Sequence, residues 1–193
     1  MTNWQENQSA AALAPGLEAA AREAGDLALG FFRAGAATSA GIRYKAGGSP
    51  VTEADEIVDA FLRDRLQRLA PDAGWLSEET ADSRERLDRR RALIVDPIDG
   101  TRAFAAGDPR WAISIALVLD GRPVAGIVHI PALRETFVAT IGGGAFCNGA
   151  AIRVSTLSAF DAGAKLAATV PTAEELHRAG LPFSSQPRVP SLA

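Results

Sequence analysis

The apolar residues of the first third of the chain recur at three- and four-residue steps, the spacing that gathers them on one face of an α-helix. The pattern predicts one helix over residues 12–34, ended by Gly35, and a second helix from about Thr52 to the residue before Pro71. A polar, glycine-rich loop is expected between them, over residues 38–50. Thr52 can cap the second helix, and acidic residues in its first turn suit the positive end of the helix dipole. The side chains expected on the buried faces are Leu13, Leu17, Ala20, Ala24, Leu27 and Phe31 in the first helix, and Ile57, Phe61, Leu62, Leu66 and Leu69 in the second.

From residue 74 onward the pattern changes to short apolar runs separated by turn residues, which favours β-strands. Asp120-Gly121 and Asn148-Gly149 are dipeptides typical of two-residue hairpin turns. The segment 82–91 is a charged loop or helical turn. The predicted strands cover residues 74–77, 92–95, 111–119, 123–130, 135–140, 145–147 and 152–154.

Two helices followed by a run of strands predict an α+β layered domain, here over residues 1–155. Residues 156–193 differ in character and are expected to begin a second α/β domain. A strand over 165–170 and a short helix over 172–179, capped by its first residue, are predicted there. The Pro- and Ser-rich tail 182–193 has no element to pack on, so we expect it to be disordered.

Composition narrows the class of protein. The 20 basic and 23 acidic residues give a net charge of −3, which argues against a nucleic-acid polymer as partner. The longest apolar stretch, 111–119, is nine residues, whereas a membrane-spanning helix needs roughly 20. The N-terminus lacks the basic and apolar regions of a targeting signal. Because Cys147 is the only cysteine, an intramolecular disulfide and a Cys-based zinc site are excluded. We therefore expect a soluble, cytoplasmic protein with no membrane partner.

The most informative segment is LIVDPIDGT, residues 93–101. An apolar strand delivers Asp96, and a tight turn through Pro97 can aim Asp99 at the same point. Gly100 allows close approach of the backbone, and Thr101 adds a hydroxyl. Two carboxylates without a nearby Cys or His favour Mg²⁺ over zinc. Placing two acidic side chains directly after an apolar strand costs free energy, and a bound cation is the best explanation for them.

Two more acidic groups lie at predicted element ends, Glu78 and Glu79 after the strand 74–77 and Asp55 at the start of the second helix. Taken singly, such acids are more often solvated surface than ligands.

Together these segments resemble the inositol monophosphatase superfamily of Mg²⁺-dependent phosphomonoesterases. The matching motifs are SPVTEAD (49–55), SEE (77–79) and DPIDGT (96–101), followed by Phe104 and by the glycine-rich segment 142–149. The resemblance covers residues 12–155 well and the rest weakly. It implies a layered αβαβα sandwich whose second α/β half is incomplete in this chain.

The resemblance also implies residue roles. Glu78, Asp96 and the backbone carbonyl of Ile98 would hold one Mg²⁺, and Asp96 and Asp99 would hold a second. Thr101 and Asp55 would orient and deprotonate the attacking water, with Glu78 close by. The amides of Gly100 and Thr101 would bind the phosphate of a small substrate, beside Ile98 and Asp99. The implied reaction is hydrolysis of a small phosphate monoester by metal-activated water, and the family is compatible with a homodimer.

The chain departs from the family pattern at two places. Ser77 stands where the family usually has glycine. The family also has a metal-ligating Asp in a downstream Trp-Asp motif, and no Trp-Asp follows position 111 here. We therefore expect a truncated member with little activity of its own.

Several alternatives stay open at this stage. Within the superfamily, a 3′(2′),5′-bisphosphate nucleotidase or a histidinol-phosphatase fits the same motifs. A haloacid-dehalogenase-type phosphatase would need its two acids two residues apart, whereas Asp96 and Asp99 are three apart. An inactive metal-binding or interaction module is the alternative from another class.

The roles of several further residues also stay open. The arginine cluster of 84–91 and Arg102 can attract phosphate or be solvated, and Lys45 can reach the site or not. We expect His129 in the core or at an edge, His177 exposed and Cys147 buried.

Overall fold

The structure of the protein, a computed structural model, describes residues 3–154, 156, 165–166, 168, 170–181 and 184–185. The chain divides into two compact units, Met1–Ile152 and Arg153–Ala193, which are described separately below. The first unit contains all the residues of the predicted site.

Helix α2 (Ala14–Leu29) corresponds to the helix predicted over residues 12–34, whereas helix α1 (Asn3–Ala11), which precedes it, was not predicted. A break at residues 12 and 13 separates the two helices. Pro15 explains the break, since proline lacks an amide and is tolerated only in the first turn of a helix, where α2 places it. The helix also ends earlier than predicted, at Gly30. The predicted burial of Leu27 was wrong, because its side chain is 40% exposed.

Helix α3 (Glu53–Leu69) confirms the second predicted helix and its cap. Thr52 and Asp55 form a capping box, in which each side chain bonds the backbone N–H of the other. Ile57 was expected on the buried face but is 38% exposed. The loop predicted over 38–50 contains a short antiparallel hairpin of β1 (Ile42–Tyr44) and β2 (Pro50–Thr52).

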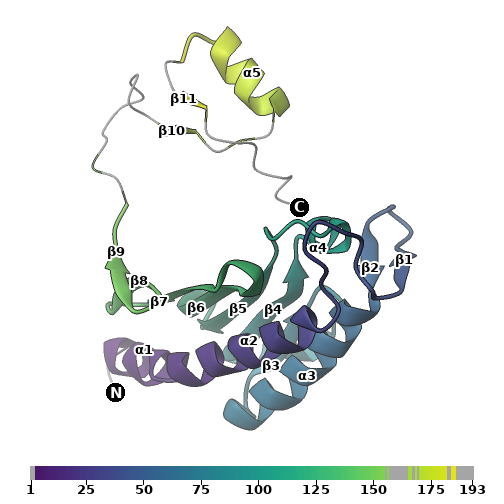
Figure 1. Ribbon diagram of the computed structural model, residues 1–193. Coiled ribbons are helices and arrows are strands. Elements are labelled where there is room, and N and C mark those ends of the chain that lie inside the picture. The colour runs from purple at the N-terminus through teal and green to yellow at the C-terminus, as the bar shows by residue number, and fades with distance from the viewer. Residues whose placement is uncertain are drawn as a thin grey trace. The chain divides into compact units, whose positions relative to one another are not determined.

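A seven-stranded sheet in the order β3-β4-β5-β6-β7-β8-β9 forms the centre of this unit (Figure 1). β3 and β4 are parallel, and every later neighbouring pair is antiparallel. The two predicted hairpin turns are present, since their four residues have the positive φ angles of a type I′ turn. The strands are β3 (Gly74–Ser77), β4 (Arg91–Asp99), β5 (Ala112–Leu119), β6 (Arg122–Ile130), β7 (Glu135–Thr140), β8 (Gly144–Cys147) and β9 (Ala150–Ile152).

Strands β3 and β7 have their predicted bounds, β5, β6 and β8 differ from them by one residue at the start, and β4 and β9 differ more. β4 runs four residues beyond the predicted end, through Asp99, and β9 lies before residues 153 and 154 because the two-residue turn at Asn148 leads directly into it. Three short helical segments join the strands: η1 (Arg84–Asp88), α4 (Thr101–Ala106) and η2 (Pro131–Leu133).

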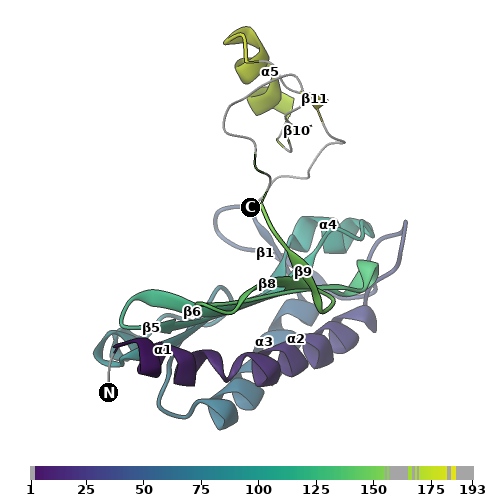
Figure 2. The ribbon, with the colours of Figure 1, turned by 90° about the vertical axis from the view of Figure 1, so that its left-hand side faces the viewer.

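Helices α1, α2 and α3 all cover the same face of the sheet (Figures 1 and 2). The core lies between these layers, where Leu17 of α2 and Leu62 of α3 are fully buried. On β5, Ile113, Ile115 and Leu117 point into the core while the residues between them are half-buried, as expected for a strand with one covered face. In this α+β arrangement, β3 and β4 are neighbouring strands and α3 packs against β4.

In the second unit, β10 (Lys165–Leu166) pairs in parallel with β11 (Ser184–Ser185), and α5 spans Val170–Arg178. Of the strand predicted over 165–170, the structure describes residues 165 and 166 as a strand, and residue 170 already belongs to α5. The helix begins before Thr172, because Pro171 is tolerated in a first turn. Apart from β11, the predicted disordered tail lies outside the described residues. None of the helices that the structure describes is long and apolar enough to cross a membrane.

Candidate active site

Asp96 and Asp99 lie near the C-terminal end of β4, where a β-bulge brings them together. Asp96 pairs with Ser114 of β5, and Asp99 pairs with Ala112. Between these two pairs, β4 therefore contains one residue more than β5. On a regular strand, side chains three positions apart point to opposite faces of the sheet. The extra residue removes that mismatch and turns both carboxylates the same way. The tight turn expected at Pro97 is thus a bulge within a continuous strand.

Gly100 connects β4 to α4 in the left-handed region, with φ 86°. The dihedral favours glycine, and the space is tight as well, because a Cβ at this position would lie 3.1 Å from the carbonyl oxygen of Arg110. Thr101 follows as the first residue of α4.

Thr101 is joined to α3 through Asp55, which is buried to 1% exposure. Thr101 Oγ1 lies 3.1 Å from Asp55 Oδ1 and 3.0 Å from the carbonyl oxygen of Ile98. The other carboxylate oxygen of Asp55 accepts bonds from the Thr52 amide at 2.8 Å and the Thr52 hydroxyl at 2.5 Å. Burial raises the pKa of Asp55, although the hydrogen bonds from Thr52 and Thr101 act in the opposite direction. Both oxygens of Asp55 are therefore held in fixed directions.

Glu78 and Glu79 follow β3, which is parallel to β4 and delivers them beside Asp96. The Glu78 amide donates to the carbonyl of Val95 at 3.4 Å. Lys45 Nζ lies 2.9 Å from Glu79 Oε1 and 3.5 Å from Glu78 Oε1, so the lysine does reach this site. Burial opposes the charge on Lys45, but its bonds and charge pairing with Glu79 and Glu78 outweigh burial and raise its pKa.

Asp96 is the most perturbed acid of the group. Burial, the charges of Glu78 and Asp99 and its contact with Glu78 raise the pKa of Asp96 to about 7. Burial and the charge of Glu78 also raise the pKa of Asp99. Three carboxylates thus repel one another across the ends of two neighbouring strands.

This donor set has the chemistry of a Mg²⁺ site, because it offers only oxygen atoms and its mutual repulsion would be relieved by a cation. Within the described parts of the chain, however, no three acidic, histidine or cysteine side chains are gathered tightly enough to hold a metal ion as they stand. Glu78 is the adjustable member, since 56% of its side chain is exposed and it is paired with Lys45. The carbonyl of Ile98 lies within hydrogen-bond distance of the Thr101 hydroxyl, and it retains a second lone pair even when it accepts that proton.

The other sequence candidates lie apart from this constellation or are neutralised. In the arginine cluster, Arg86 pairs with Asp82 and Arg91 with Asp72, while Arg90 bridges Asp120 and Glu6. Arg102 is exposed on α4. His129 is buried and bonded to Thr136, which confirms the core prediction, whereas Cys147 is only half-buried.

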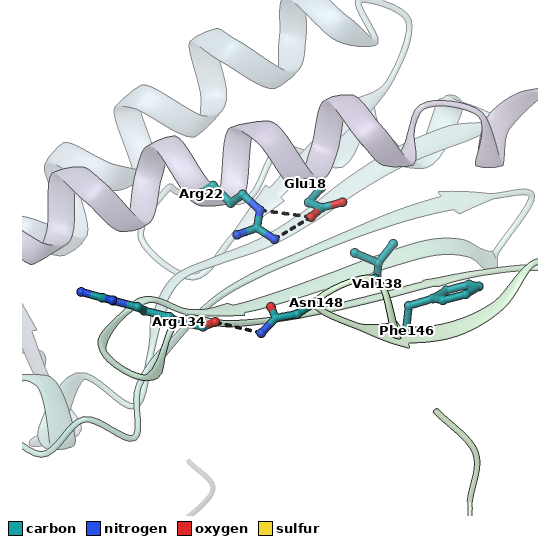
Figure 3. Close-up of a pocket in the computed structure, with 7 residues that line it drawn as sticks. Glu18, Arg22, Arg134, Val138, Phe146 and Asn148 are labelled. Carbon is teal, nitrogen blue, oxygen red and sulfur yellow. Dashed lines mark hydrogen bonds and ion pairs between the residues drawn. The ribbon is translucent and has the colours of Figure 1, made fainter. Parts of the chain in front are cut away.

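A separate pocket of about 570 Å³ lies between α2 and the strands β7 and β8 (Figure 3). Glu18 and Arg22 of α2, which are ion-paired at 2.9 Å, face Val138, Phe146 and Asn148 across it. It contains none of the predicted site residues.

Comparison with known proteins agrees with the site motifs. The sequence profile of the Inositol monophosphatase family matches residues 10–187. A histidinol-phosphatase from Mycobacterium tuberculosis is 42% identical over 137 residues, which are 71% of this chain and 48% of that protein. Inositol monophosphatase 2 from Solanum lycopersicum is 37% identical over 142 residues, 72% of this chain and 52% of that protein. The chain spans about half the length of these relatives.

Solved structures show the same fold. The extragenic suppressor protein suhB from Bartonella henselae superposes with a TM-score of 0.76 at 29% identity, covering 92% of this chain and 70% of that one. An IMPase from Thermotoga maritima gives a TM-score of 0.71 at 31% identity, covering 86% of this chain and 65% of that one.

Proposed function

Because the chain belongs to the inositol monophosphatase family, we propose that it carries the metal and phosphate site of a Mg²⁺-dependent hydrolase of small phosphate monoesters. The observation that supports this most is the pairing of two features at one place: three mutually repelling carboxylates, and beside them a threonine hydroxyl held by a buried aspartate. The first suits a cation, and the second suits control of a water molecule.

Glu78, Asp96 and Asp99 would hold the cation, together with the carbonyl of Ile98. When bound, Mg²⁺ supplies Lewis-acid chemistry: it lowers the pKa of water and neutralises charge on a phosphate group. For Glu78 to contribute, its exposed side chain must exchange its pairing with Lys45 for the cation. Lys45 would then retain Glu79 as its partner at 2.9 Å.

Thr101 and Asp55 would manage the proton of the attacking water. The Thr101 hydroxyl has one proton, which it can donate either to Asp55 Oδ1 or to the Ile98 carbonyl. A lone pair of Thr101 Oγ1 is left to accept a proton from water. Because Thr52 holds the other oxygen of Asp55, the carboxylate can receive that proton through Thr101 without turning away. The phosphate contact at the Gly100 and Thr101 amides belongs to the same proposal.

The substrate class follows from the relatives only as a set of candidates. Two proteins named histidinol-phosphatase match this chain at 37% and 42% identity, inositol monophosphatase 2 matches at 37%, and a 3′(2′),5′-bisphosphate nucleotidase matches at 38%. Phosphate release from histidinol phosphate, inositol monophosphates and 3′-phosphoadenosine 5′-phosphate is the direct test. A cytoplasmic location and a homodimer remain predictions.

Thr101→Val is expected to lower kcat by about 10²–10⁴-fold with little change in KM, since the hydroxyl acts on the water in the transition state. Thr101→Ser, which keeps the hydroxyl, is the matched control and should retain most of the rate. Phosphate release is measured on the 193-residue chain and on a fusion that continues it with the unmatched half of the M. tuberculosis relative.

Each outcome of this experiment separates the alternatives. Release that EDTA abolishes and Thr101→Val suppresses supports the proposal. A pure KM effect of Thr101→Val would reduce Thr101 to a phosphate-binding residue. Trapping of a phosphoaspartate would favour the haloacid-dehalogenase-type reaction, and Mg²⁺ binding without turnover in either protein would favour a non-catalytic metal-binding module.

A further inference from the structure

Asp59 is a second buried acid on α3, one helical turn after Asp55. It is 7% exposed, and residues four apart lie on the same face of a helix. Its neighbours on that face, Val58 and Leu62, are buried apolar residues. A carboxylate in such a place is costly unless hydrogen bonds satisfy it. The hydrogen-bond partners of Asp59 therefore indicate its role.

Both partners of Asp59 flank the Glu78-Glu79 pair. The hydroxyl of Ser77 donates to Asp59 Oδ1, and the hydroxyl of Thr80 donates to Asp59 Oδ2 at 2.5 Å. Ser77 is itself 6% exposed, and its hydroxyl also accepts the Glu79 amide at 3.3 Å. One carboxylate on α3 thus ties down both ends of a four-residue segment.

We propose that Asp59 is a positioning residue, which with Ser77 and Thr80 forms a clamp that fixes the direction of Glu78 and Glu79. The proposal rests on the proposed function in one respect, the role of Glu78 as a cation ligand. Glu78 lies at the centre of the clamped segment, and its exposed side chain is paired with Lys45 only at the long distance of 3.5 Å. Fixing the backbone on either side is what restricts where this carboxylate can reach.

The clamp also explains why a serine at position 77 is useful. A glycine at this position has no hydroxyl and leaves Asp59 with Thr80 alone. Helix α3 then acts as one platform for two parts of the site: Asp55 holds Thr101 of α4, and Asp59 holds the segment after β3. The two hydroxyls use both carboxylate oxygens as acceptors, whereas an asparagine side chain offers one acceptor oxygen and a donor NH₂ group.

The first test is hydrogen–deuterium exchange without any metal, on the full chain. In Asp59→Asn, the amides of residues 77–80 should exchange at least about tenfold faster, while those of β5 stay unchanged. Asp64→Asn is the matched control, because it is the same change on the same helix at a side chain that is 64% exposed and paired with Arg68. Unchanged exchange at 77–80, or an equal increase in Asp64→Asn, would overturn the clamp.

The second test is Mg²⁺ affinity by calorimetry. Residues behind a ligand typically change metal affinity by about 10–100-fold, so Asp59→Asn should weaken binding by about tenfold. In a Ser77→Ala/Thr80→Val background, Asp59→Asn should cause no further loss, because the carboxylate has then lost both of its partners. Fully additive losses would assign Asp59 a general structural role and reject positioning.

The two tests keep the inference separate from the proposed function. If the unaltered chain binds no Mg²⁺, the proposed function fails together with the ligand role of Glu78, and the exchange data still decide whether the clamp exists. If Asp96→Asn abolishes binding while Asp59→Asn leaves it unchanged, the metal site stands and the positioning role is wrong.

Discussion

Asp96→Asn is expected to stabilise the cation-free protein at pH 8 while it weakens Mg²⁺ binding at least tenfold. In the folded protein, burial and the charges of Glu78 and Asp99 raise the pKa of Asp96 to about 7, from an ordinary value of 3.8. The folded state therefore binds this proton more tightly than the unfolded state does. Stability falls as pH rises from about 4 to about 7 and is flat above that. Asn stays neutral and does not contribute this fall.

The expected gain at pH 8 is on the order of 2–3 kcal/mol, after allowing for solvent screening of a half-buried group. Urea denaturation in EDTA at pH 4 and pH 8 measures it, and the two proteins should differ only at the higher pH. Asp64→Asn, at an exposed side chain, should show no such difference. Equal stability of Asp96→Asn and the unaltered chain at both pH values would mean that Asp96 is not held among repelling charges.

In Asp96→Asn, the stability of the cation-free protein and the affinity for Mg²⁺ are expected to change in opposite directions, as they should for a metal ligand. A residue selected for stability alone would not be an acid here, because a neutral side chain of the same shape is better tolerated in the folded protein. Only a cation reverses the balance, since it attracts the same charges that repel one another without it. Gain of stability with loss of affinity would therefore distinguish a ligand from a structural acid.

The sequence predicted those parts of the site that depend on neighbouring residues. The apolar run before Asp96, the glycine at position 100 and the cap at Thr52 are local signals, and each has the predicted place in the structure. The bulge between Asp96 and Asp99 was not predicted, because it depends on the register with β5. A tight turn and a bulge use the same residues and differ only in the partner strand.

Most contacts between segments that are distant in the chain could not be predicted from the sequence. Lys45 was an open candidate, and its pairing with Glu79 depends on how the β1–β2 hairpin meets the end of β3. Asp59 was missed, although one signal was available: it lies four residues after Asp55 among apolar neighbours. Helix α1 was missed because its segment, NWQENQSAA, is mostly polar and has no apolar stripe at helical spacing.

Gly107→Ala is expected to be among the most damaging single substitutions in this unit, although the glycine is not itself a predicted ligand. Gly107 ends α4 with φ 75°, where a side chain is strained. A Cβ there would lie 2.3 Å from the carbonyl oxygens of both Arg33 and Ala36, which are backbone atoms that cannot turn aside. The surrounding contacts are close because the Gly107 carbonyl accepts the Gly35 amide at 2.9 Å.

Gly121→Ala is the matched control for this substitution. Gly121 has φ 76° in the β5–β6 turn, and nothing lies within 4 Å of the point that a Cβ would occupy, so alanine there incurs the dihedral strain without the clash. We expect a loss of about 1–2 kcal/mol for Gly121→Ala from strain, and of about 2–5 kcal/mol for Gly107→Ala from strain and overpacking together. Urea denaturation of the two variants and the unaltered chain measures the difference.

The functional consequence follows from what α4 carries. The helix is six residues long, with Thr101 at its start and Gly107 at its C-cap, so a shift of the end by the added methyl is transmitted along less than two turns. Gly107→Ala protein that still folds should therefore lose the bond between Thr101 and Asp55, and with it the Mg²⁺-dependent phosphate release. Gly121→Ala should keep it. Equal stability of the two variants would show that the contact between α4 and the 33–38 segment is loose enough to yield, and that Thr101 is held by Asp55 and the Ile98 carbonyl alone.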